Sequence, residues 1–398
     1  MRILWIKTEL LHPVDKGGRI RTYQMLRSLA RKHEVTYLCL DDGQAAPDAK
    51  QRAVEYCTKL VTVPFSAATK GGLRFFGELL VNLLSPLPYA VARYRSAQLE
   101  SEIRRLADQS DLVICDFLAP ALNVPDGLPT PTVLFQHNVE AMIWERHAAV
   151  PQSLPKRLFM RLQAHRMRRF EAAQCRRFIS VVAVSRADAL KMEHRYGRSG
   201  ITDVSTGVDL EYFSPLPAVK RSPNELVFVG SMDWLPNQDG ISWFIESIFP
   251  ELRRRVPGVR LLVVGRTPPA ELRALAERVG DVEVTGTVDD VRPYLARAAI
   301  SIVPLRIGGG TRLKIYEAMA MGAPIVSTRV GAEGLPLQHG EHLLLADSPQ
   351  EQVTAIESLL RDAHAASELA ARAGRYVQAN GSWGAIADQF VNQTSKTA

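Results

Sequence analysis

Short runs of apolar, mostly β-branched residues recur along the chain, and the stretches between them are long enough for a helix. In the first half these runs lie at residues 3–6, 35–40, 112–115, 132–135 and 179–184, and in the second half at residues 226–229, 261–264, 282–284, 300–303 and 324–327. Runs that are apolar throughout are typical of strands buried on both faces of a parallel sheet, joined by right-handed helical crossovers. The pattern predicts an α/β protein with a doubly wound, Rossmann-like sheet in each half.

The segment at residues 213–223 contains three prolines among polar residues, and we expect it to continue neither a strand nor a helix. At 398 residues the chain also exceeds the usual size of a single core. We therefore expect an N-terminal domain over 1–212, a linker over 213–223 and a C-terminal domain over 224–375. Residues 376–398 would form a helix that packs back towards the N-terminal domain. Open parallel sheets bind ligands at the carboxyl ends of their strands, so two such domains predict a cleft between them.

The composition, with 46% hydrophobic and 23% charged residues, excludes a wholly disordered or collagenous chain. Four scattered cysteines argue against a disulfide framework or a zinc site, and they favour a reducing, cytoplasmic compartment. The most apolar stretch, residues 75–92, contains Glu78 and is interrupted by Pro86 and Pro88. We therefore expect it not to span a membrane.

Positive charge is concentrated in the first half of the chain. Residues 1–222 hold 32 Lys and Arg against 22 Asp and Glu, whereas residues 223–398 hold 17 against 20. Much of the excess lies in residues 156–177, where the only acid is Glu171. On a helix, several cations of this segment fall along one side: Arg157, Arg161, His165, Arg168 and Arg176. Such a face is either simply solvated or in contact with anionic lipid or another polyanion.

The strongest candidate for ligand chemistry is the glycine-rich segment after the run at 300–303, formed by Gly308, Gly309, Gly310 and Thr311. Glycines let the backbone approach a ligand, and Thr311 can cap a helix whose N–H groups and dipole attract an anion. Arg312 and Lys314 add positive charge to the first turn, where it opposes the helix dipole unless an anion offsets it. The segment predicts a phosphate site.

Glu317 is the only acid in the apolar helix that follows this segment. A buried carboxylate must accept hydrogen bonds, either from protein donors such as Arg312 or from ligand hydroxyls such as those of a ribose. The glycine-rich segment just before it favours the ligand interpretation.

Two segments of the first half offer further candidates. Gly17 and Gly18, followed by Arg19, lie between the first strand and a predicted helix, although taken alone they favour a plain turn. His137 follows the run at 132–135, where it could contact sugar hydroxyls or pack into the wall of the site. No grouping of His, Asp or Glu has metal-ligand spacing, and no Walker or nucleophile-elbow motif occurs, which disfavours metal and triad chemistry.

Taken in order, these motifs resemble the GT-B glycosyltransferases of family four, retaining enzymes that use nucleotide-sugar donors. The likeness extends over nearly the whole chain and rests on an ordered set: Gly17-Gly18, His137-Asn138, Val184-Ser185, Thr206 to Asp209, Phe228-Val229-Gly230, Val264-Gly265, Gly286 and residues 304–331.

The resemblance implies a role for each matching residue. Glu317 would hold the donor ribose, Gly17 and Gly18 would approach the diphosphate, and His137 would contact the transferred sugar. Gly286 and Thr287 would hold the base. Positive groups would stabilise the departing nucleoside diphosphate, such as UDP, without a metal or other cofactor.

The implied function is the retaining transfer of a sugar to a glycan or lipid-linked acceptor in bacterial polysaccharide or glycoconjugate biosynthesis. The protein would then lie in the cytoplasm, with peripheral contact at the anionic inner face of the cell membrane. Alternatives are a nucleotide-sugar epimerase of the same fold, a catalytically silent scaffold and a polyanion-binding protein. Nucleic acid is the least favoured partner, because basic and aromatic residues are not interleaved.

The sequence departs from the family pattern at two points. The first of the family's two glutamates would fall at Gly309, and the cations expected after Phe228-Val229-Gly230 are replaced by the segment from Ser231 to Asn237. We expect Arg312 and Lys314, together with Arg19, to supply the missing positive charge.

Overall fold

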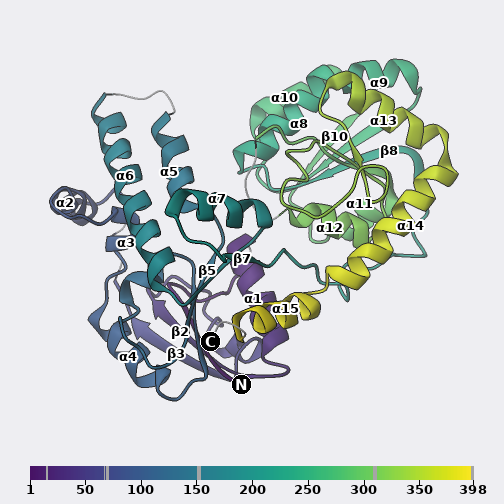
Figure 1. Cartoon of the computed structure of the whole chain (residues 1–398). Helices are drawn as coiled ribbons and strands as arrows, with labels where there is room; N and C mark the ends of the chain where they lie inside the picture. Colours follow the sequence, from purple (N-terminus) through teal and green to yellow (C-terminus); the bar gives the residue numbers. More distant parts are fainter. Residues whose placement is uncertain (15–16, 67, 69–70, 150–153, 308–311, 396–398) are drawn as a thin grey trace. The chain divides into compact units, whose positions relative to one another are not determined.

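The computed structural model describes residues 1–14, 17–66, 68, 71–149, 154–307 and 312–395. They form two compact units, each with its own sheet (Figure 1). The first unit comprises Met1–Ser205 together with the residues from Ile386 onward, and the second comprises Thr206–Ala385. The chain thus enters the second unit before the proline-rich segment at 213–223 and returns to the first unit near its end.

In the described part of the first unit, seven strands form a parallel sheet in the order β3-β2-β1-β4-β5-β6-β7. The strands are β1 (Arg2–Lys7), β2 (Glu34–Asp41), β3 (Lys59–Pro64), β4 (Leu112–Asp116), β5 (Thr132–Gln136), β6 (Ser180–Ala183) and β7 (Thr202–Asp203). The helices are α1 (Gly17–Leu29), α2 (Leu73–Asn82), α3 (Tyr89–Ala92), α4 (Ala97–Ala107), α5 (Glu140–Ala149), α6 (Leu154–Arg177) and α7 (Arg186–Tyr196), with short 3-10 helices η1 (Gln51–Glu55) and η2 (Ala119–Asn123).

In the described part of the second unit, six strands form a parallel sheet in the order β10-β9-β8-β11-β12-β13. The strands are β8 (Ser222–Val229), β9 (Arg260–Val264), β10 (Val282–Gly286), β11 (Ala298–Val303), β12 (Ile325–Ser327) and β13 (Leu344–Leu345). The helices are α8 (Leu235–Ser247), α9 (Phe249–Arg255), α10 (Ala270–Val279), α11 (Arg292–Arg297), α12 (Leu313–Ala320), α13 (Pro349–Arg361) and α14 (Ala363–Asn380).

Several helices begin and end at residues suited to these positions. Ser96 and Ser185 precede α4 and α7, and their side-chain oxygens accept hydrogen bonds from the backbone N–H groups of Leu99 and Asp188. Helix α7 ends at Gly197, whose φ of 62° costs glycine little. Local sequence signals therefore fix where these helices start and stop.

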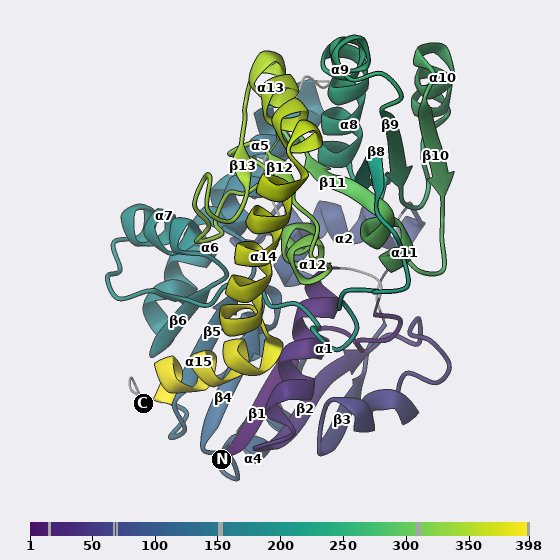
Figure 2. The ribbon, with the colours of Figure 1, turned by 90° about the vertical axis from the view of Figure 1, so that its right-hand side faces the viewer.

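The last helix, α15 (Trp383–Ser395), completes the core of the first unit (Figure 2). The fully buried ring of Phe390 has its centroid 5.8 Å from that of Trp5 and 5.0 Å from that of Phe135. On the surface of the same helix, Asp388 accepts a hydrogen bond from Lys32 at 2.7 Å. The first unit therefore contains residues from both ends of the described chain.

The prediction of two doubly wound α/β sheets is confirmed, and each predicted apolar run overlaps a strand. The prediction missed β3, β7 and β13. Strand β3 lies at an edge of its sheet and is largely only partly buried, while β7 and β13 have two residues each, so none forms a fully buried apolar run. The expectation that segment 213–223 enters no strand is wrong at Pro223, the second residue of β8. Proline is tolerated near the start of a strand, where few ladder hydrogen bonds are needed.

Each sheet has one position where the strand order reverses. In the first unit this position lies between β1 and β4, and in the second unit between β8 and β11. The connections on the two sides of such a point leave towards opposite faces of the sheet, and a crevice opens at the carboxyl ends of the two strands. These two strand edges are where ligand-binding residues are expected.

Candidate active site

The candidate site in the second unit lies at the carboxyl ends of β8 and β11, where α12 begins. Arg312 occupies the N-cap position of α12 with a left-handed backbone conformation (φ 53°), and Leu313 is the first helical residue. Gly308, Gly309, Gly310 and Thr311, predicted to approach the phosphate, lie outside the described residues. The described part of this site is therefore α12 itself and the segment that follows β8.

Lys314 is held by groups from the β8–α8 segment. Its Nζ donates a hydrogen bond to Oδ1 of Asn237 at 2.7 Å and lies 4.3 Å from the ring centroid of Phe228. Nδ2 of Asn237 in turn donates to the backbone oxygen of Ser231 at 2.7 Å, which fixes the orientation of the amide. Burial lowers the pKa of Lys314 to about 7, and the charge of Glu317 offsets this effect only in part.

The glycine at position 230 makes room for this lysine. A Cβ atom added to Gly230 would lie 2.8 Å from Nζ of Lys314 and 2.8 Å from Nδ2 of Asn237. The segment from Ser231 to Asn237, which replaces the family's usual cations, thus supplies the hydrogen-bond acceptor that holds the Lys314 ammonium of α12. Sequence reasoning missed this role of Asn237, because an asparagine in the first turn of a helix is common.

Glu317 is partly buried on the same helix, three residues beyond Lys314. Burial raises its pKa to about 7, and Lys314 lowers the pKa only in part. Among the described residues, none forms a hydrogen bond or ion pair with the Glu317 carboxylate. Arg312, the structural partner considered for it, instead has Nη2 at 3.5 Å from Oε2 of Glu333. The carboxylate therefore has unused capacity to accept hydrogen bonds among the described residues.

Gly286 and Thr287, predicted to hold the base, lie at the end of β10, near the edge of the same sheet. Gly286 is buried with a φ of 77°, and a Cβ atom there would lie 3.2 Å from Nη2 of Arg273. Thr287 is exposed. In the strand order, β9 and β8 lie between β10 and β11, the strand that precedes α12.

The candidate site in the first unit contains a buried cluster of charged groups at the ends of β1 and β4. Asp116 accepts hydrogen bonds from Nε1 of Trp5 at 3.0 Å, Nζ of Lys7 at 2.9 Å and Oγ1 of Thr22 at 2.6 Å. The Lys7 side chain is 2% exposed and that of Asp116 is fully buried. Although burial opposes ionisation, the charge of Lys7 and the contact with His137 hold the pKa of Asp116 well below its usual range.

His137 lies against this cluster, one residue beyond β5. Its Nε2 is 2.7 Å from Oδ1 of Asp116, and its ring stacks on Phe117 with centroids 3.9 Å apart. Burial lowers its pKa to about 4, so the imidazole is neutral at pH 7. Within the described part of the chain, Nδ1 of His137 has no hydrogen-bond partner. Both ring nitrogens are buried, and Nε2 is the one that lies against Asp116.

The predicted glycine pair comes close to His137 through Phe117. Helix α1 begins at Gly17, and a Cβ atom on Gly18 would lie 3.1 Å from Cζ of Phe117. Arg19, expected to add positive charge to the site, donates hydrogen bonds to Oε2 of Glu9 at 2.9 and 2.6 Å. Its charge is therefore largely compensated within the first unit.

Sequence reasoning missed Lys7, Thr22 and Asp116. The available signal was a charged residue at the end of an otherwise apolar strand, since Lys7 ends β1 and Asp116 ends β4. These are the two strands that flank the reversal of strand order.

Two further observations concern the described residues only. They contain no group of three or more His, Cys, Asp or Glu side chains placed to hold a metal ion, and none of their helices is both long and apolar enough to cross a membrane.

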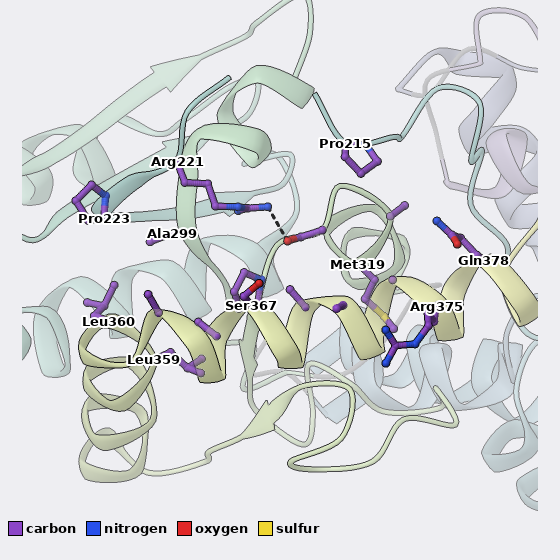
Figure 3. Close-up of a pocket in the computed structure, with 18 residues that line it drawn as sticks. Pro215, Arg221, Pro223, Ala299, Met319, Leu359, Leu360, Ser367, Arg375 and Gln378 are labelled. Atoms are coloured by element: carbon purple, nitrogen blue, oxygen red, sulfur yellow. Dashed lines mark hydrogen bonds between the residues drawn. The ribbon is translucent and has the colours of Figure 1, made fainter. Parts of the chain in front are cut away.

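A cavity of about 650 Å³ lies in the second unit, beside α14 and the end of α12, where Met319 and Ala320 line it (Figure 3). It is lined at the amino ends of the strands by Pro223, Ala299 and Pro324, and by small residues of α14. None of the predicted site residues is among its lining residues. The nucleotide-site candidate is therefore the carboxyl edge of the sheet and not this cavity.

Comparison with known proteins identifies both halves of the chain. A family model described as Glycosyltransferase Family 4 matches residues 16–212, and a model described as Glycosyl transferases group 1 matches residues 223–362. The chain is 29% identical over 206 residues to the GDP-mannose-dependent alpha-(1-6)-phosphatidylinositol monomannoside mannosyltransferase of Mycobacterium tuberculosis, a match that covers 47% of this chain and 53% of that protein. The chain spans about half the length of the curated relatives that it matches.

The fold is similar to that of solved glycosyltransferase structures. HepE of Anabaena in complex with UDP matches with a TM-score of 0.70 and 15% identity over 100% of both chains. Sucrose-phosphate synthase of Thermosynechococcus elongatus matches with a TM-score of 0.71 and 19% identity, over 100% of this chain and 98% of that one. These likenesses support the two-domain GT-B fold.

Proposed function

Because this chain belongs to the GT-B glycosyltransferases of family four, as the two family models together indicate, we propose that it transfers a sugar from a nucleoside-diphosphate sugar to a glycan or lipid-linked acceptor. The observation that carries the proposal is the environment of Glu317. Its carboxylate is partly buried beside Lys314 and has no hydrogen-bond partner among the described residues. The two hydroxyls of a ribose are donors of the kind that this carboxylate requires.

The charges of α12 suit a nucleoside diphosphate. Hydroxyl donors would favour the ionised form of Glu317, and a diphosphate near Lys314 would favour the ammonium form of the lysine. Each group has a pKa of about 7 without the ligand. Donor binding would therefore shift both groups towards their ionised forms, and the contacts that these forms make with the donor would contribute to affinity.

Positive groups near the phosphates also serve the reaction. As the bond between the sugar and the diphosphate breaks, negative charge grows on the leaving group, and Lys314 and Arg312 would stabilise it. His137, neutral and in contact with Asp116, would contact the transferred sugar. As in the family it belongs to, we expect transfer with retention, in which the leaving phosphate helps to deprotonate the acceptor hydroxyl on the same face of the sugar.

We expect the donor to bind without a divalent metal, since the cations of α12 supply the charge that a metal would otherwise provide. The names of similar proteins suggest which nucleotides to test, because HepE was crystallised with UDP and the mycobacterial relative is GDP-mannose-dependent. A lipid-linked acceptor would bring the protein to a membrane surface.

Titration calorimetry with UDP, GDP, ADP and dTDP in the presence of EDTA tests the proposal. We expect one diphosphate to bind, and Glu317→Gln to weaken its binding about tenfold or more, because a neutral amide accepts hydrogen bonds less strongly than a carboxylate. The matched control is Glu277→Gln, an exposed position on α10. Equal affinities for the two variants would refute the role of Glu317.

Mass spectrometry of products formed from the matching nucleotide sugar tests the reaction itself. A sugar linked to an acceptor supports transfer. Accumulation of an epimerised nucleotide sugar without an acceptor product, detected by NMR spectroscopy because the epimer has the same mass as the donor, would support the epimerase alternative instead.

A further inference from the structure

Helix α2 exposes apolar side chains to solvent and turns polar groups towards the rest of the first unit, which is the reverse of the usual arrangement. Six large apolar side chains are exposed on it or just beyond its end, among them Val81 at 73% and Leu83 at 44%. Four of the six form a ridge along one side: Leu73 at 93%, Phe76 at 54%, Leu80 at 67% and Leu84 at 92%. At 100° per residue, these positions fall within about 80° of one another around the helix axis. An apolar ridge of this width on the solvent side of a helix marks a contact surface for another body.

The inner side of α2 carries polar groups that are satisfied within the first unit. Asn82 accepts a hydrogen bond from Nε2 of Gln163 at 3.0 Å, and the backbone oxygens of Asn82 and Leu83 accept from Arg166, each at 2.8 Å. Gln163 and Arg166 belong to α6, which lies beside α2 (Figure 1). The orientation of α2 is therefore fixed by α6, and its apolar ridge is held outward.

Helix α6, which holds α2, also exposes apolar and positively charged side chains. Leu158 is 56% exposed. From the helical period, Arg169 lies about 20° and Arg166, which reaches α2, about 80° around the axis from Leu158 in one direction, while Arg161 lies about 60° from Leu158 in the other direction. Arg161 and Arg169 are exposed. Arg169 thus lies on the flank of α6 towards α2 and Arg161 on the opposite flank, so positive charge borders Leu158 on both sides.

Negative charge near the ridge is neutralised. Glu78, the only acid of α2, accepts hydrogen bonds from Nε of Arg74 at 3.1 Å and from the hydroxyl of Tyr89 at 2.9 Å. The only acid of α6, Glu171, is buried and accepts hydrogen bonds from backbone N–H groups of α5. The surface therefore combines exposed apolar groups with uncompensated positive charge.

We infer that the α2 ridge, formed by Leu73, Phe76, Leu80 and Leu84, together with Leu158, Arg161 and Arg169 of α6, docks on the surface of a bilayer that contains anionic lipid. The leucines and the phenylalanine insert between the headgroups, and the arginines contact lipid phosphates. A second copy of the chain fits this surface less well, because symmetric pairing would bring the two cationic faces together.

The inference extends the proposed function, from which it takes the lipid-linked acceptor, but it is tested without donor or acceptor. Sedimentation with vesicles of phosphatidylcholine, with and without phosphatidylglycerol, measures the bound fraction of the full chain. We expect strong binding only to the vesicles that contain phosphatidylglycerol, and weaker binding at high salt. Absence of binding to both kinds of vesicle would overturn the docking surface while leaving nucleotide binding untouched.

Variants identify the surface. Leu80→Ser combined with Leu84→Ser should reduce binding about tenfold or more, and Arg161→Ala combined with Arg169→Ala should reduce it about tenfold at low salt and little at high salt. The matched control is Val54→Ser combined with Leu190→Ser, two exposed apolar positions of the same unit at 83% and 48%. An equal loss in this control would refute the assignment.

Light scattering and nucleotide calorimetry complete the test. The expected result is unchanged mass and unchanged nucleotide affinity in every variant. A shift from dimer to monomer in the Leu80/Leu84 variant, with vesicle binding retained, would show that the ridge pairs two copies of the chain and would overturn the bilayer assignment.

Discussion

Removal of Lys7 should destabilise the first unit far more than removal of an exposed lysine. In Lys7→Met, the ammonium that lies 2.9 Å from Asp116 is lost, and the fully buried carboxylate keeps only the donors of Trp5 and Thr22 and the contact with His137. Breaking one side of a buried pair costs about 3–5 kcal/mol, because the remaining charge stays desolvated. For a unit of this size, the loss corresponds to a fall in melting temperature of roughly 10 °C.

The same cluster predicts that the effects of two substitutions on stability will not add. In the double variant Lys7→Met with Asp116→Asn, no charge remains to be compensated, so the double variant should be more stable than Lys7→Met alone. The exposed pair Lys32–Asp388, at 2.7 Å and about half exposed on each side, provides the control. Lys32→Met should cost less than about 1 kcal/mol.

Differential scanning calorimetry measures these changes, with the transition of the first unit identified as the one that does not shift when the nucleotide is added. The reasoning would be refuted if Lys7→Met melted within a degree or two of Lys32→Met. It would also fail if the effects of Lys7→Met and Asp116→Asn were simply additive.

Three further predictions concern particular contacts. Nucleoside diphosphate affinity should be greatest near pH 7, because protonation of Glu317 weakens binding below that pH and deprotonation of Lys314 weakens it above. Calorimetry from about pH 5 to about pH 9 measures this profile, and in Lys314→Met the fall in affinity at alkaline pH should disappear. If the alkaline fall is unchanged in that variant, Lys314 is not its origin. Gly230→Ala should weaken nucleotide binding severalfold by displacing Nζ of Lys314, whereas Gly77→Ala, with open space around its Cβ position, should leave binding unchanged. Equal nucleotide affinity in both variants would contradict the close approach of Lys314 to Gly230. Glu171→Gln should lower the stability of the first unit by about 1–3 kcal/mol. The Glu171 carboxylate now accepts hydrogen bonds from the backbone N–H groups of Glu140 and Ala141, and in the variant the NH₂ group of the glutamine would face one of these donors. An unchanged melting curve would contradict that arrangement.

The fold could be predicted from the sequence because strands buried on both faces leave a strong local signal. All five residues of β4 are buried, and all five are apolar except the terminal Asp116. Edge strands such as β3 leave no such signal, because one side faces solvent and polar residues are tolerated there. The order of the strands emerges only from contacts between segments far apart in the chain.

The candidate site was predictable where one segment contains several functional residues. Glu317 and Lys314 lie three residues apart on α12, so a single motif pointed to both. The Lys7–Asp116 pair could not be found in this way, since its members are more than a hundred positions apart and each looks like the polar end of a strand. Asn237 was missed for a related reason, because its partner Lys314 lies on another helix.

The position of Phe390 has a consequence for biosynthesis. The ribosome makes residues 386–395 only after every residue of the second unit has been added, so the nascent first unit must wait with a gap beside Trp5 and Phe135. The second unit carries all its own strands in one uninterrupted segment and can close earlier. The first unit is synthesised first, but its hydrophobic core is therefore completed last.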